Sequence, residues 1–196
     1  MKTALLFVSV LLRALTSAEI VVQVKPGGKA SFHCSIADSQ NILKWLRGNE
    51  LVYSSNPRTG MPLKGQAAIM SRSRLKNEQD LDVSGVTRED AGLFTCKVNE
   101  RAEHHRLVVS SASVSPSGSL DSGSRAVLSC DVAGLVEGSV VQWRGPNGQT
   151  ENSATVTLNS VTVNDSGSWK CAFSSSGKDL SETVDVKVRG AVTLFS

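Results

Sequence analysis

The chain has 196 residues, of which 40% are hydrophobic and 20% are charged. This composition is typical of a globular protein with room for one large domain or two small ones. With 21 basic and 18 acidic residues the formal charge is only +3, which excludes a strong general preference for nucleic acid.

Residues 1–18 have the pattern of a secretory signal peptide. Lys2 precedes an apolar run from Ala4 to Leu12, and small residues lead up to Ala18. The run is too short to span a bilayer and Arg13 ends it, so a membrane helix is the weaker interpretation. We expect cleavage after Ala18, which leaves 19 basic and 18 acidic residues (21 − 2 = 19) and makes disulfides the expected state of the four cysteines.

The mature chain contains an internal repeat with the order Cys, Trp, Asp, Gly, Cys. The first copy is Cys34, Trp45, Asp90, Gly92 and Cys96, and the second is Cys130, Trp143, Asp165, Gly167 and Cys171. From Cys to Trp the spacing is 11 residues in one copy and 13 in the other, which suits a strand, a turn and the next strand. Alternating apolar residues in "KASFHCSI" and "RAVLSCDV" indicate half-buried strands, and helical signals are almost absent.

The repeat resembles the immunoglobulin superfamily over nearly all of residues 19–189. This resemblance implies disulfides Cys34–Cys96 and Cys130–Cys171 between facing sheets, with a core tryptophan beside each, Trp45 and Trp143. Two positions before the second Cys the family usually has a Tyr whose hydroxyl bonds to the backbone. Here Phe94 and Trp169 occupy that core position, and Phe94 has no hydroxyl, so its corner must depend on packing.

The two copies differ in length. Cys34 and Cys96 are 62 positions apart, which leaves room for two extra strands, whereas the 41 positions of the second copy leave none. We therefore predict an all-β fold of two tandem immunoglobulin-like β-sandwiches. The first, residues 19–110, is variable-type; the second, residues 111–189, is compact and constant-type; and residues 190–196 begin a truncated third domain. The link "HRLVVSSASVSPSGS" has no long Gly/Pro-rich spacer, so we expect one strand to continue between the domains and stiffen the pair.

No group of residues predicts catalysis, a cofactor or a metal site. His104 and His105 are neighbours in a predicted strand, so their side chains face opposite ways and cannot share one metal ion. Asn164 begins the only Asn-x-Ser/Thr triplet and is a candidate glycosylation site, although the corner role of Asp165 explains the triplet without a glycan. Binding is therefore the expected function, and we predict that the protein is not an enzyme.

The best candidate for binding is the stretch "NPRTGMPLKGQAAIMSRSRLKN" at residues 56–77. It contains five basic residues and no acid, and Met61 lies at a Gly-Met-Pro tip. A basic edge with an apolar tip suits an acidic protein surface. Alternatively, Arg72 or Arg74 bridges Asp90, Met61 folds under its own loop, and the remaining charges are merely solvated. The candidate partner-binding residues are Met61, Lys64, Arg74, Arg58 and Arg72.

The chain also resembles the cluster of differentiation four family of helper T-cell co-receptors. The resemblance lies in a variable-like domain whose last strand is expected to continue into a short second domain, in the segment "DSGSWKC" and in the ending "VKVRGAVTLFS". In that family the contact with class II major histocompatibility (MHC) molecules is made by a loop tip of Gly and an aromatic residue, which is followed by Lys-Gly. Arginines on strand D of the variable-type domain belong to the same contact. Here "TGMPLKG" matches with Met61 in place of the aromatic residue, and "SRSR" supplies Arg72 and Arg74.

The family resemblance has two departures and several implications. Mammalian members lack a Cys where Cys130 stands, and their tip is Phe where Met61 stands, so the chain resembles a distant, non-mammalian member. The implied protein is a single-pass type I protein of the cell membrane that binds a class II MHC-like molecule on an opposing cell. Its full-length form is expected to associate with a Src-type kinase. A related lymphocyte-activation inhibitory receptor and a secreted or adhesive immunoglobulin module stay open as alternatives.

Overall fold

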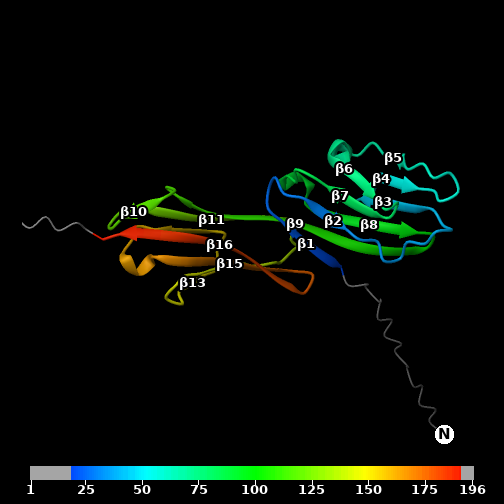
Figure 1. The fold of residues 1–196 in the computed structure, drawn as a ribbon. Helices are drawn as coiled ribbons and strands as arrows, with labels where there is room; N and C mark the ends of the chain where they lie inside the picture. The colour runs from blue at the N-terminus through cyan, green and yellow to red at the C-terminus, as the bar shows by residue number, and fades with distance from the viewer. Residues whose placement is uncertain (1–18, 191–196) are drawn as a thin grey trace, which may run out of the picture.

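The computed structural model describes residues 19–190, which form two β-sandwiches arranged end to end (Figure 1). The predicted signal peptide, residues 1–18, and residues 191–196 of the predicted third domain lie outside this range. Within residues 19–190 no helix is long and apolar enough to cross a membrane.

The first sandwich pairs a large sheet with a sheet of three strands. In the large sheet the order is β9-β8-β3-β4-β5, with β1 running parallel to β9, and the smaller sheet has the order β2-β7-β6. Strands β4 and β5 are the two extra strands that the longer cysteine spacing predicted. The elements are β1 Ile20–Val24, β2 Ala30–Phe32, β3 Leu43–Arg47, β4 Glu50–Ser55, β5 Leu63–Lys64, η1 Ala68–Arg72, β6 Ser73–Lys76, β7 Asp80–Val83, η2 Arg88–Asp90, β8 Gly92–Val98 and β9 Arg101–Ser115.

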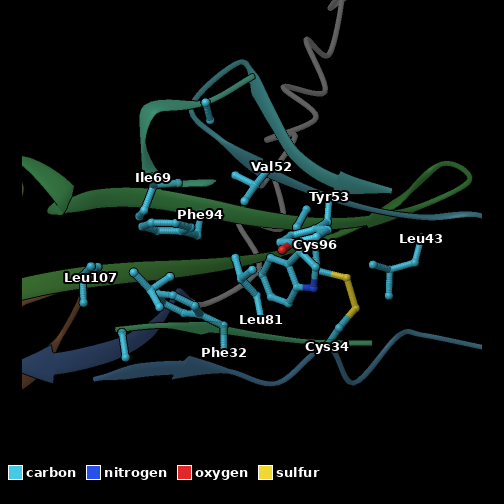
Figure 2. Packing of buried hydrophobic residues seen from close by; sticks show 14 of the residues in the cluster. Phe32, Cys34, Leu43, Val52, Tyr53, Ile69, Leu81, Phe94, Cys96 and Leu107 are labelled. Carbon is cyan, nitrogen blue, oxygen red and sulfur yellow. A yellow bond between two sulfur atoms is a disulfide. The ribbon is translucent and has the colours of Figure 1, made fainter. Parts of the chain in front are cut away.

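The core of the first sandwich lies between these sheets and is crossed by the disulfide Cys34–Cys96 (Figure 2). Trp45 and Phe94 are both 0% exposed. The ring of Phe94 stacks on that of Phe32 with centroids 4.5 Å apart, so packing holds the corner that lacks a tyrosine hydroxyl. The predictions for Trp45 and Phe94 as core residues are confirmed.

The second sandwich is more compact. One sheet has the order β14-β11-β9 and the other has the order β10-β16-β15-β12-β13. The prediction that the second cysteine spacing leaves no room for an extra strand is wrong in one respect, because the two-residue strand β13 pairs with β12 beyond the core strands. Its elements are β10 Ser119–Asp121, β11 Ala126–Ala133, β12 Val141–Arg144, β13 Thr150–Glu151, β14 Thr155–Leu158, η3 Val163–Asp165, β15 Gly167–Ser175 and β16 Lys178–Arg189.

The second core repeats the plan of the first with a different corner. The disulfide Cys130–Cys171 joins its sheets, and Trp143 and Trp169 are buried as predicted. The indole N–H of Trp169 donates a hydrogen bond to the carbonyl oxygen of Asp165 at 3.0 Å. This bond satisfies a buried donor and replaces the hydrogen bond that a tyrosine hydroxyl makes at this corner.

The strand β9 belongs to both sandwiches. Its first half, Arg101–Leu107, pairs with β8 of the first domain, and its second half, Val109–Ser115, pairs with β11 of the second. Val21 and Val108 from the first domain pack into the core of the second. This shared strand and shared apolar packing confirm the predicted direct connection and stiffen the junction.

A buried polar cluster also holds the junction together. The side-chain amide of Gln23 donates to the hydroxyl oxygen of Ser110 and to the carboxylate of Glu182, both at 2.9 Å. The Ser110 hydroxyl donates to the same carboxylate at 2.7 Å. Because Glu182 lies on β16 of the second domain and is 7% exposed, these bonds fix the orientation of one domain on the other.

Glu19 adds an ion pair at the edge of this junction. Arg106 donates to its carboxylate from Nε at 2.5 Å and from Nη2 at 2.8 Å, and the Ser176 hydroxyl donates to it as well. The hydrogen bond with Arg106 lowers the pKa of Glu19 to about 2, against the opposing effect of burial. The folded-state pKa therefore lies below the ordinary value of 4.5, so the carboxylate stabilises the fold above about pH 4.5 and loses this contribution as the pH falls toward 2.

We expect Glu19→Gln to lower the free energy of unfolding at pH 7 by about 2 kcal/mol, as for a hydrogen bond to a charged group. The deficit relative to the unsubstituted protein should shrink as the pH falls from 4.5 to 2. Thermal unfolding across this range measures it, with the exposed Glu137→Gln as the control. A deficit that does not change with pH would contradict the assignment.

Candidate protein-binding surface

The edge of the first domain is a hairpin formed by β4 and β5. Ser54 pairs with Leu63, and Tyr53 pairs with Lys64. After β5 the chain passes so close to β4 that a Cβ on Gly65 would lie 1.7 Å from the carbonyl oxygen of Leu51. Only glycine fits there, which explains the Gly of "MPLKG" and fixes the position of the tip that precedes it.

Two large apolar side chains are exposed at this tip. Met61 is 78% exposed and Leu63 is 65% exposed, the highest values among the large hydrophobic residues that the structure describes. Met61 therefore does not fold under its own loop. Leu63 was not predicted from the sequence, although it lies two residues after Met61 in the stretch chosen as the binding edge, and alternate residues of a strand share a face.

Arg58 and Lys64 lie on the same edge. The backbone N–H of Arg58 donates to Oδ1 of Asn56 at 3.0 Å, within the turn that leads to the tip. Tyr53, the partner of Lys64, turns into the core and donates its hydroxyl proton to the Ser73 carbonyl at 2.8 Å. Paired residues share a face, so Lys64 projects to the side of the second sheet while Leu63 projects to the outer face.

Arg72 forms an ion pair with Asp90 in the turn before β8, so it is not a free surface charge. It donates two hydrogen bonds to the carboxylate of Asp90, from Nη1 at 2.6 Å and from Nη2 at 2.7 Å. Burial alone would raise the pKa of Asp90, but Arg72 and the backbone N–H of Thr87 hold it below its ordinary value. Most of the hydrogen-bonding capacity of Arg72 is thus used inside the fold.

Arg74 lies on the opposite sheet from the tip. It is on β6, is 75% exposed, and its guanidinium is 3.6 Å from the carboxylate of Asp82. Asp82 also binds Lys29 and Ser31, each at 2.7 Å, and these bonds lower its pKa against the opposing effect of burial. Of the five candidate residues, the structure therefore gathers Met61, Lys64 and Arg58 on one edge and separates Arg72 and Arg74 from them.

The other polar residues considered from the sequence, His104, His105 and Asn164, lie away from this edge. The side chains of His104 and His105 have different surroundings. His105 is buried, with Nε2 2.9 Å from Oε1 of Glu103, whereas Nδ1 of His104 is 3.1 Å from the hydroxyl oxygen of Thr95. Burial lowers the pKa of His105. Within the described part of the chain no cluster of three or more His, Cys, Asp or Glu side chains could hold a metal ion. Asn164 is exposed in η3, where a glycan would meet no steric barrier from burial.

Known proteins resemble the chain at the level of fold and overall sequence. Residues 17–110 match the family model of the immunoglobulin V-set domain. The T-cell surface glycoprotein CD4 of Canis lupus familiaris is 24% identical over 199 residues, covering 91% of this chain and 42% of the dog protein, so the chain spans less than half of that relative. Domains 3 and 4 of rat CD4 superpose with a TM-score of 0.55 at 14% identity, covering 86% of this chain and 99% of the rat chain.

Proposed function

We propose that this immunoglobulin-superfamily chain, whose residues 17–110 match a V-set domain, is the extracellular part of a CD4-like T-cell surface co-receptor. In this proposal the first domain binds a class II MHC-like molecule on an opposing cell through the edge formed by β4 and β5. The protein is anchored in the cell membrane as a type I protein, and its cytoplasmic part associates with a Src-type kinase.

The observation that carries the proposal is the exposure of Met61 and Leu63 on one edge. Neither side chain is covered, at 78% and 65% exposure, although the same hairpin buries Val52 and Tyr53. Exposed apolar residues next to basic ones are a common composition of protein-binding surfaces. The edge is small, so the interaction is expected to be weak and transient.

We expect Met61→Ser and Leu63→Ser each to weaken binding to class II molecules of the same species by about tenfold, because each removes an apolar anchor. Surface plasmon resonance with multimerised ectodomain measures this effect. The matched control is Val163→Ser, which alters a residue of the second domain that is 56% exposed. It should bind like the unsubstituted protein.

Two outcomes separate the ligand from the site. If both edge variants stay folded and bind as well as the control, the site assignment is wrong. If the unsubstituted multimer shows no binding to class II molecules, the ligand is wrong, and an inhibitory or adhesive immunoglobulin receptor becomes the better hypothesis.

A further inference from the structure

A row of directly paired residues crosses the large sheet of the first domain and ends at the exposed tip. Lys97 of β8 pairs with Lys44 of β3, Lys44 pairs with Ser54 of β4, and Ser54 pairs with Leu63 of β5. Residues paired across strands project from the same face of a sheet. The two lysines therefore share a face with Leu63.

The core residues show that this is the outer face. Trp45 and Cys96 oppose each other next to the row and are both 0% exposed, so they point inward. Lys44 and Lys97 adjoin them in sequence and must point outward, since side chains alternate along a strand. Both lysines are exposed.

The two lysines have no counter-charge among the residues that the structure describes. Within residues 19–190 no ion pair includes Lys44 or Lys97. Like charges directly opposite each other destabilise a sheet. An acidic group of a partner would remove this repulsion and gain two favourable interactions at once.

We infer that the binding edge extends onto this row, and that the partner is a protein surface with an apolar pocket and a carboxylate beside it. The inference rests on the proposed function, because the apolar anchor is the same tip. Adjacent strands are about 4.8 Å apart, so the carboxylate lies about 10–15 Å from the pocket that receives Leu63. The inference thus assigns a role to Lys44, Lys97 and Leu63, and it predicts the charge pattern of the partner.

The row favours an acidic protein over other occupants. Ser54 and Ala102, the paired neighbours on either side of the lysines, are uncharged, so the row offers no extended basic track for a sulfated glycan. A second copy of the chain docked with its two-fold axis at this row would bring the lysine pairs of the two copies together. A protein carboxylate fits two adjacent ammonium groups without these difficulties.

The second domain supplies a matched control. Arg144 of β12 and Lys170 of β15 are also directly opposite each other and exposed, and no ion pair of residues 19–190 includes them. Lys44→Glu/Lys97→Glu and Arg144→Glu/Lys170→Glu change the net charge equally. We expect the first double variant to bind class II multimers at least about tenfold more weakly and the second to bind within about twofold of the unsubstituted protein.

The outcomes distinguish the inference from the proposed function. If Met61→Ser weakens binding but Lys44→Glu/Lys97→Glu does not, the inference is wrong and the proposed function stands. Equal losses in both double variants would show an effect of net charge alone and would also overturn it, as would loss of binding to heparan sulfate with class II binding unchanged. Absence of class II binding by the unsubstituted protein overturns both. Should the glutamate variant not fold, Lys44→Gln/Lys97→Gln tests the same contact with a smaller loss expected.

Discussion

Replacement of Arg72 by alanine is expected to lower the free energy of unfolding of the first domain by about 2–4 kcal/mol. The substitution leaves the carboxylate of Asp90, which is 5% exposed, without its cation, and breaking a buried pair from one side is costly. The expected loss of stability is smaller than for a fully buried ion pair because the Arg72 side chain is 33% exposed. Urea and thermal unfolding followed by tryptophan fluorescence measure it.

Arg74→Ala is the matched control for Arg72→Ala. Its side chain is 75% exposed and 3.6 Å from Asp82, so its loss should change stability by less than about 0.5 kcal/mol. Arg72→Lys keeps the charge but not the two-pronged hydrogen bonding, and it should fall between the two. Equal stability of the Arg72 and Arg74 alanine variants would refute the structural role of Arg72.

The fold was accessible from the sequence because its marks are local and repeated. The cysteine, tryptophan and Asp-x-Gly positions recur in order, and each lies where the structure places a disulfide, a core indole or a corner. The length between cysteines correctly predicted the extra strands β4 and β5. It failed for β13 because a two-residue strand needs almost no additional chain.

The candidate surface was only partly accessible from the sequence. The run of basic residues and the Gly-Met-Pro pattern indicated the tip at Met61, but the sequence does not give the register between strands. Register places Leu63 in one row with Lys44 and Lys97, and the pairing of β6 with β7 places Arg74 in the other sheet. The choice of Arg72 over Arg74 as partner of Asp90 likewise depends on the neighbouring elements, because Arg72 at the end of η1 reaches Asp90, whereas Arg74 on β6 lies beside Asp82 of the paired strand β7.

Loss of either disulfide is expected to have the largest effect on stability. Replacing both cysteines of a pair by alanine frees a loop of 62 residues in the first domain or 41 in the second. Chain entropy attributes about 4 kcal/mol to each closure, with a difference of only about 0.4 kcal/mol between them. This is a large share of the stability of a small domain, so each altered domain should be largely unfolded at 37 °C.

The shared junction determines how far each loss spreads. Val21 and Val108 of the first domain pack in the second core, and β9 pairs with β11. Cys130→Ala/Cys171→Ala should therefore also lower the melting temperature of the first domain. The expected decrease is larger than the few degrees that the loss of one surface contact would cause. Differential scanning calorimetry on the two double variants resolves the domains. If the first domain melts unchanged when the second has lost its disulfide, the two sandwiches are independent units and the junction does not couple their stability.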